Sequence, residues 1–183
     1  MHSEKTLSYF INESKNIENK NFKKKIKIAI LSSYTLNGLK EITQVKCAEN
    51  KILASIYEGP YNQYSQEILN ENSDLYKFKP DIVFLIIDSR NIFDELYHFP
   101  YLKSTEQKKI FVSEKISEIK YLINIFTKKS DATMIVSNLN IPSNSSYGIA
   151  EQKTNYSLNE MIQEFNSILN LDYKSSNYVA MLD

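Results

Sequence analysis

The longest apolar run of the chain lies within the segment Pro80-Asp-Ile-Val-Phe-Leu-Ile-Ile-Asp88. Residues 82–87 are all apolar, and this is the length of a strand. A strand with one solvated face would alternate apolar and polar residues, and this one does not. The pattern predicts a strand covered on both faces, at the centre of a parallel sheet between helices. Pro80 is compatible because the first residue of a strand can spare its amide.

Shorter apolar segments with strand or helix periodicity occur on both sides of this run. Ser104-Thr-Glu-Gln107 and Ser157-Leu-Asn-Glu160 are capping boxes that predict the start of two helices. We expect strands at residues 26–33, 52–57, 131–138 and 177–183. We expect helices at residues 1–23, 36–50, 104–126 and from 157 onward, with shorter helical segments at 61–68 and 89–97.

The alternation of these elements predicts an α/β fold of three layers, with helices on both faces of a doubly wound, parallel sheet of about five strands, as in flavodoxin-like proteins. Strand order 2-1-3-4-5 is the simplest arrangement. It places the carboxyl ends of the first and third strands side by side, where ligands bind in open α/β sheets. Residues 139–156 form a long loop at the same edge, and loops of that length are usually functional or disordered.

The organisation of the chain follows from these elements. Residues 1–25 are interpreted as an N-terminal helix and a basic linker, and residues 26–183 as one α/β domain. The run Lys20-Asn-Phe-Lys-Lys-Lys-Ile-Lys27 is interpreted as a solvated segment flanking a buried strand. A buried parallel strand normally leads into a covering helix, but the chain stops on its fifth strand. We therefore expect the domain to be truncated at its C-terminal end.

The composition argues against several classes of function. The 183 residues include 22 basic and 22 acidic side chains, and this balance favours neither nucleic acid nor membrane binding. The single cysteine, Cys47, excludes an intrachain disulfide and indicates a reducing compartment, so a cytoplasmic location is expected. With 3 glycines, the chain has no glycine-rich loop of the P-loop or dinucleotide-binding type. We expect no cofactor and no metal site in this chain.

Polar residues follow three of the predicted strands, and the topology gathers them into one pocket. A serine after the first strand, a glycine amide after the second and a polar residue after the third form an esterase-like arrangement. The serine would attack an acyl group, and the other two groups would hold the oxyanion. The candidate pocket residues are Ser32, Ser33, Thr35, Asn37, Gly59, Tyr61, Asn62, Asp88, Ser89, Arg90 and Asn91.

Three segments resemble a known family. They are Ile28-Ala-Ile-Leu-Ser-Ser-Tyr-Thr-Leu-Asn37, Gly59-Pro-Tyr-Asn-Gln-Tyr-Ser-Gln-Glu-Ile-Leu69 and Ser73-Asp-Leu-Tyr-Lys-Phe-Lys-Pro-Asp-Ile-Val83. In this order and spacing they look like the N-terminal domain of FkbH-like proteins, which is similar to SGNH hydrolases. The resemblance covers most of residues 26–183 and implies an SGNH-hydrolase-like fold.

The resemblance also implies partners. FkbH-like proteins carry a haloacid-dehalogenase-like domain with an Asp-x-Asp signature after this domain, and some members load a glyceryl unit onto an acyl carrier protein. No Asp-x-Asp nucleophile loop is found up to Asp183. An acyl carrier protein and a downstream haloacid-dehalogenase-like domain are therefore the partners that the family suggests.

The resemblance assigns two roles and also shows where this sequence departs from the SGNH pattern. Ser33 falls at the nucleophile position, and Gly59 falls near the oxyanion glycine. The Gly-Asp that precedes the SGNH serine is Leu31-Ser32 here, and the Gly-x-Asn-Asp block is Asp88-Ser-Arg-Asn91. The Asp-x-x-His block that supplies the general base is absent up to Asp183, and a serine without a base is a weak nucleophile.

A flavodoxin-like receiver or nucleotide-binding module is a further alternative, but neither an aspartate at the end of the first strand nor a glycine-rich loop supports it. Two main hypotheses follow. In the first, the domain is non-catalytic and binds an acyl substrate or an acyl carrier protein, with Arg90 as a bidentate donor to a phosphate or carboxylate. In the second, it is an SGNH-type esterase or acyltransferase that uses Ser33 with a base supplied from outside this chain. His98, between aromatic residues and a proline, is interpreted as a packed or surface histidine.

Overall fold

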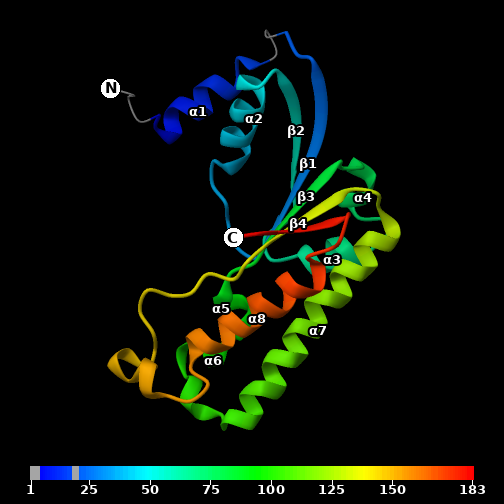
Figure 1. The fold of residues 1–183 in the computed structure, drawn as a ribbon. Coiled ribbons are helices and arrows are strands. Elements are labelled where there is room, and N and C mark those ends of the chain that lie inside the picture. The colour runs from blue at the N-terminus through cyan, green and yellow to red at the C-terminus, as the bar shows by residue number, and fades with distance from the viewer. Residues whose placement is uncertain (1–4, 18–20) are drawn as a thin grey trace.

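The computed structural model describes residues 5–17 and 21–183 and has a five-stranded, wholly parallel sheet (Figure 1). The strand order is β2-β1-β3-β4-β5, which confirms the predicted order. The α/β architecture predicted from the alternating pattern is present, with helices flanking the sheet. The strands are β1 (Lys24–Ser32), β2 (Ile52–Glu58), β3 (Ile82–Ile86), β4 (Thr133–Ser137) and β5 (Val179–Leu182).

Eight α-helices and two short 3-10 helices connect and cover these strands in the described residues. The helices are α1 (Leu7–Ser14), α2 (Leu39–Glu49), α3 (Tyr64–Leu69), α4 (Asp74–Phe78), α5 (Ser89–Phe93), α6 (Glu95–His98), α7 (Thr105–Lys129) and α8 (Leu158–Tyr173). The 3-10 helices are η2 (Pro100–Leu102) and η3 (Gly148–Lys153). Both predicted capping boxes are confirmed, at Ser104 for α7 and at Ser157 for α8.

The main core lies on one face of the sheet. Alternate residues of the central strands, such as Val83 and Leu85 of β3, are fully buried there. They pack against apolar residues of α7 and α8, including Phe126 and Phe165, and against α3 and α4. Burial of each such side chain stabilises the fold by roughly 1.5–3 kcal/mol, so this layer holds most of the sheet together.

The second face of the sheet is covered less completely. α1 and α2 lie on this side, over β1 and β2 (Figure 1). Leu39 and Cys47 of α2 pack against a smaller cluster built on Ile28 and Ile30 of β1. Burial also raises the pKa of the Cys47 thiol, which keeps it in the unreactive protonated form.

The expectation for the central strand is therefore only half correct. Val83 and Leu85 are buried, but Ile82, Phe84 and Ile86 on the other face are half-buried. An unbroken apolar run indicates that a strand has two apolar faces, but it does not establish that helices cover both of them along their whole width.

The element boundaries differ from the prediction at several positions. The N-terminal helix comprises only Leu7–Ser14, and residues 1–4 and 18–20 of the predicted helix lie outside the described residues. β1 begins at Lys24, so part of the basic run belongs to the strand itself. α2 begins at Leu39 instead of residue 36, because Gly38 adopts a left-handed φ of 84° at the N-cap. The polar segment before β3 contains α4, which the pattern did not predict.

Gly38 lies close to the half-exposed side chain of Leu7 in α1. A Cβ atom at Gly38 would lie 2.2 Å from Leu7 Cδ1, whereas a Cβ at Gly148, also left-handed, would meet nothing within 4 Å. Gly38→Ala should therefore cost more stability than Gly148→Ala. The Gly148 variant carries only the cost of placing an alanine at a left-handed φ, about 1–2 kcal/mol. Thermal unfolding measures the difference, and hydrogen exchange should show faster exchange in α1 for the Gly38 variant alone. Equal losses in the two variants would contradict this account.

Candidate functional site

Ser33 lies directly after β1 and bridges β1 and β3. Its amide donates to the carbonyl of Ile86 at 3.1 Å, and its Oγ accepts a hydrogen bond from the amide of Asp88 at 2.9 Å. The residue is fully buried, with 0% of its surface exposed. The hydroxyl thus satisfies a backbone donor at the point where β3 ends. This geometry does not present Ser33 to a substrate, and it does not favour the nucleophile role that the resemblance assigned.

Asp88 and Arg90 form a fork at the end of β3. Asp88 is the N-cap of α5 and accepts from the amide of Arg90 at 2.8 Å. The Arg90 guanidinium donates through Nε at 3.0 Å and through Nη2 at 2.7 Å to the two carboxylate oxygens. The Asp88 side chain is 9% exposed and that of Arg90 is 62% exposed. The pair therefore has a buried carboxylate and a guanidinium that reaches solvent.

The hydrogen bonds from Arg90 hold the pKa of the Asp88 carboxyl below its usual value, although burial of the carboxyl opposes them. The bond to Asp88 also raises the pKa of Arg90, and the hydroxyl groups of Tyr97 and Tyr34 contribute electrostatically. Asp88 is thus held ionised and Arg90 protonated near neutral pH. The bonds to Asp88 use the Nε–Nη2 edge of the guanidinium, and among the described residues no hydrogen bond uses Nη1. A planar guanidinium can donate through a second edge, so Arg90 can still bind an anion.

A small pocket of about 110 Å³ lies at the carboxyl ends of β1 and β2. It brings together four of the predicted residues, namely Ser32, Thr35, Gly59 and Tyr61. Sequence reasoning missed Tyr34, Leu36 and Glu58, which also line the pocket. The pocket and the fork lie at the carboxyl ends of neighbouring strands, because β1 pairs with β3.

The structure corrects the expectation that Gly59 holds an oxyanion. Its amide donates to the carbonyl of Ile30 at 2.9 Å and so extends the β1–β2 hydrogen bonding. A Cβ at this position would lie 2.6 Å from Leu31 Cδ2. Glycine is therefore required here for close packing against a buried leucine, and its amide is already used.

The remaining predicted residues occupy supporting positions. Asn62 has a left-handed φ of 52° and donates its amide to the carbonyl of Ser32. The fully buried Ser89 donates its hydroxyl to Asn140 Oδ1 at 3.3 Å, which ties α5 to the loop after β4. Asn37 and Asn91 are exposed. The Ser32 hydroxyl donates to the carbonyl of Tyr34 and stabilises the turn after β1.

The loop at residues 139–156 is ordered by buried polar contacts. The buried Lys108 of α7 donates through Nζ to Tyr147 Oη at 2.7 Å. Glu151, also buried, accepts from the amide of Asn159 at 2.9 Å and from the hydroxyl of Ser145. These bonds hold the loop, including η3, against the N-terminal ends of α7 and α8.

No histidine is seen beside Ser33 within the described part of the chain. His98 is exposed at the end of α6, and its ring centroid lies 5.2 Å from that of Tyr97 and 6.2 Å from that of Phe99. This placement agrees with its interpretation as a surface histidine. The described residues also contain no cluster of three potential metal ligands and no helix long and apolar enough to cross a membrane.

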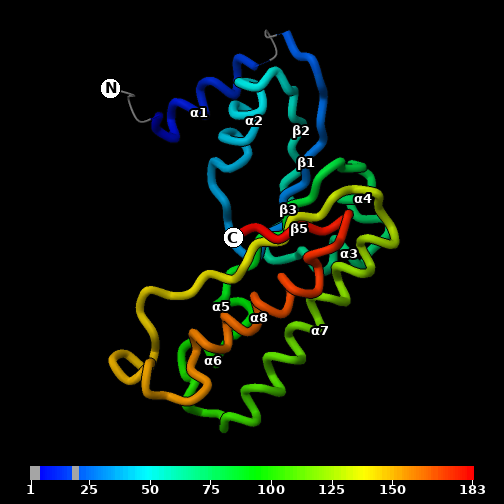
Figure 2. The backbone as a smooth tube through the Cα atoms, viewed as in Figure 1, coloured from blue at the N-terminus to red at the C-terminus, as the bar shows by residue number. Residues whose placement is uncertain are grey.

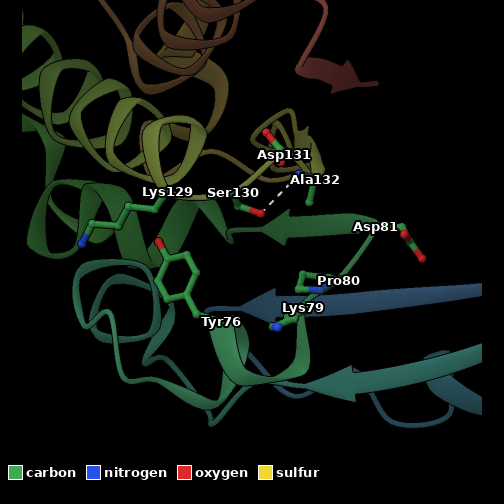
Figure 3. Close-up of a pocket in the computed structure, with 8 residues that line it drawn as sticks. All are labelled: Tyr76, Lys79, Pro80, Asp81, Lys129, Ser130, Asp131 and Ala132. Atoms are coloured by element: carbon green, nitrogen blue, oxygen red, sulfur yellow. Dashed lines mark hydrogen bonds between the residues drawn. The ribbon is translucent and has the colours of Figure 1, made fainter.

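A separate cavity of about 420 Å³ lies at the opposite, amino-terminal edge of the sheet. Figure 3 shows its lining, in which Asp81, Lys129 and Asp131 extend away from the centre. The Ser130 hydroxyl accepts from the amide of Ala132 at 3.2 Å. Ligands of open α/β sheets bind at the carboxyl edge. The smaller pocket at the carboxyl ends of β1 and β2 is therefore the better candidate, despite its size.

A family model described as FkbH, N-terminal domain, matches residues 27–182. No curated protein matches the sequence.

Two solved structures share the fold. The N-terminal part of BF1531 from Bacteroides fragilis, which contains a phosphatase domain and was complexed with Mg, is similar with a TM-score of 0.75 and 15% identity, over 96% of this chain and 44% of that chain. The chain thus spans less than half the length of that relative. The lipase Lip_vut3 from a goat rumen metagenome has a TM-score of 0.53 and 12% identity, over 86% of this chain and 80% of that chain. At these identities the likeness concerns the fold alone.

Ser33→Ala tests the structural role of the hydroxyl. The substitution leaves the buried amide of Asp88 without an acceptor, which should lower the free energy of unfolding by about 1–3 kcal/mol. The matched variant Ser32→Ala removes a hydroxyl that only stabilises a half-buried turn and should cost less. Denaturant titration measures both values. If Ser33→Ala keeps wild-type stability, the bridging role is wrong.

The Asp88–Arg90 pair predicts a pH dependence of stability. Because the pKa of folded Asp88 is lowered from its ordinary value of 3.8, the pair stabilises the protein fully above that value and loses this contribution as pH falls through the folded pKa. Asp88→Asn should thus be less stable than wild type at neutral pH, and the difference should shrink below pH 3.8. Thermal unfolding of both proteins measures this stability difference. The scan should run from about pH 2.5 to about pH 7, which is roughly the range in which carboxyl groups titrate.

Asp74→Asn is the matched control for this titration, because Asp74 pairs with Lys77 at 3.0 Å but both side chains are at least 67% exposed. Exposed ion pairs contribute little to stability, so the stability of Asp74→Asn should match that of the wild type at every pH. A difference between Asp88→Asn and wild type that stays constant with pH would contradict the assignment.

Proposed function

Because the chain belongs to the FkbH N-terminal domain family, we propose that it is a non-catalytic module that binds an acyl substrate or the arm of an acyl carrier protein. In this proposal the module works together with a phosphatase-type domain, by analogy with BF1531, whose N-terminal part contains a phosphatase domain. The proposed site comprises the pocket at the carboxyl ends of β1 and β2 and Arg90, which follows the adjacent strand β3.

One observation carries the proposal. The Ser33 hydroxyl is buried and accepts from the Asp88 amide, while the solvent-exposed Arg90 keeps one donor edge available at the carboxyl end of β3, the strand next to β1. Covalent catalysis needs an accessible nucleophile with a base in reach. Anion binding needs only an oriented cation, and Asp88 orients Arg90. The arrangement supports recognition more than acyl transfer.

The chemistry of the ligand follows from these groups. The pocket wall includes Ile30, Leu36 and the ring of Tyr61, which suit a short apolar chain or a thioester. The outer edge of Arg90 suits a phosphate or carboxylate, because a guanidinium binds these groups through two parallel hydrogen bonds. The prosthetic arm of an acyl carrier protein combines both, since it carries a phosphate at one end and a thiol-linked acyl group at the other. The module needs no cofactor for this role.

The esterase hypothesis requires a different state of Ser33. Its hydroxyl would have to leave the Asp88 amide and become exposed, and a base would have to come from outside the described residues. The lipase-like fold does not supply either group, because similarity at 12% identity concerns the fold alone.

Phosphopantetheine and pantetheine, which differ by one phosphate, test the proposal by calorimetric titration. Wild-type protein should bind phosphopantetheine about ten- to a hundredfold more tightly than pantetheine, because hydrogen bonds to charged groups contribute about 1.5–3 kcal/mol. Arg90→Ala should abolish this preference, and Arg90→Lys should restore it only in part, because lysine lacks the planar fork.

Lys103→Ala is the control, because Lys103 is an exposed cation on the segment between η2 and α7. It should leave the preference unchanged. Equal affinity of the wild type for both compounds, or a preference that survives Arg90→Ala, would rule out the proposed site.

A further inference from the structure

The loop at residues 139–156 runs beside the two short helices that follow β3. It leaves β4, passes α5 and α6 and returns to the start of α8 (Figure 2). α5 carries Arg90, whose exposed guanidinium is the proposed anion-binding group. We refer to residues 139–156 as the strap, because they connect these two short helices to α7 and α8.

Two hydrogen bonds join the strap to α5 and α6. Ser89, which directly precedes Arg90 and is fully buried, donates its hydroxyl to Asn140 Oδ1 at 3.3 Å. The hydroxyl of Ser146 donates to the carbonyl of Tyr97 in α6 at 2.6 Å. The strap therefore holds the α5–α6 segment near both of its ends, and Arg90 lies between the two contacts in the chain.

The α5–α6 segment needs support from outside its own helices. α5 has five residues and α6 has four, and helices this short are not stable by themselves in water. Asp94, which joins them, has a left-handed φ of 46°, which persists in a residue other than glycine only when the surrounding structure imposes it. Ile92, Phe93 and Leu96 bury the apolar side of the segment in the main core. The strap adds the hydrogen bonds that this apolar packing does not supply.

A buried lysine anchors the strap to α7. Lys108 is 3% exposed, and its Nζ donates to Tyr147 Oη at 2.7 Å and to the carbonyl of Tyr156 at 3.4 Å. Both partners belong to the strap, and no carboxylate of the described residues forms an ion pair with this ammonium. A buried charge is costly unless its hydrogen bonds are made, so Lys108 stays in place only while the strap is closed on it. Tyr147 directly follows Ser146, which holds α6.

We propose that the strap positions Arg90 for anion binding and that Lys108 is the positioning residue that anchors the strap. Lys108 fixes Tyr147, and the adjacent Ser146 fixes the carbonyl of Tyr97. Release of Lys108 therefore loosens the α5–α6 segment and the guanidinium that it carries. The statement about anion binding rests on the function proposed above, whereas the coupling of the strap to α5 and α6 does not depend on any ligand.

Hydrogen exchange of the full chain measures the coupling without a ligand. Lys108→Met keeps an unbranched side chain of similar length but removes the ammonium, so both hydrogen bonds to the strap are lost. Amide exchange should become about tenfold faster in the strap and also in residues 89–98, because the lost bonds favour local opening. Tyr147→Phe removes one acceptor and keeps the ring, and it should change exchange in the same two segments by a smaller factor.

Calorimetric titration with phosphopantetheine and pantetheine measures the effect on Arg90. In Lys108→Met the preference for the phosphate-bearing compound should fall at least about threefold. The affinity for pantetheine should stay unchanged, because residues of the β1 and β2 ends line the pocket. A general loss of structure would instead lower both affinities together. A wild type without any preference would overturn the positioning of Arg90 for anion binding together with the function proposed above, and hydrogen exchange would then decide the coupling.

Lys115→Met is the matched control on the same helix. The Nζ of Lys115 also lies near an aromatic ring, 5.6 Å from the centroid of Phe111, but it pairs with Glu118 at 2.9 Å. This variant should leave both the exchange rates and the phosphate preference at wild-type values. Faster exchange of the strap in Lys108→Met with unchanged exchange in residues 89–98 would overturn the proposal. Unchanged exchange of the strap itself would overturn it equally.

Discussion

The hydrogen bond from the amide of Asp88 to the hydroxyl of Ser33 is the contact on which the carboxyl edge of this sheet depends. β1 and β3 are neighbours in space but are separated by 55 residues between these two positions. The bond extends their pairing by one step past Ser32 and Ile86, where the regular ladder ends. It fixes Asp88 as the N-cap of α5, and Asp88 in turn orients Arg90. A buried amide without an acceptor would be costly, so the serine is retained by the fold itself.

The same hydrogen bond also bears on whether the Ser33 hydroxyl is available for catalysis. An SGNH-like fold places a serine at the end of its first strand, and an esterase must expose that hydroxyl to a base and a substrate. Here the hydroxyl is committed to the backbone, and Gly59 is committed in the same way to Ile30. Both positions to which the resemblance assigned roles make structural connections. Within the part of the chain that the structure describes, no hydrogen bond uses Nη1 of Arg90, and this supports recognition of an anion at this edge.

The sequence predicted the topology well because the apolar period and the capping boxes are local signals. The strand order followed from the buried character of β3 and from short connections, and Ser104 and Ser157 marked the two long helices. The site was predicted less well. Strand ends identify which loops meet, but they do not tell which polar groups the backbone will use. The burial of Ser33 and the Asp88–Arg90 fork depend on hydrogen bonds between distant segments.

Labelling with a fluorophosphonate probe tests the central claim most directly, because this reagent reacts with serines that are both accessible and activated. The account predicts that the wild-type chain remains unlabelled under conditions in which a serine esterase reacts completely, since the Ser33 hydroxyl is buried against the Asp88 amide. Labelling of the wild type that disappears in Ser33→Ala would contradict it and would establish an active serine at this site.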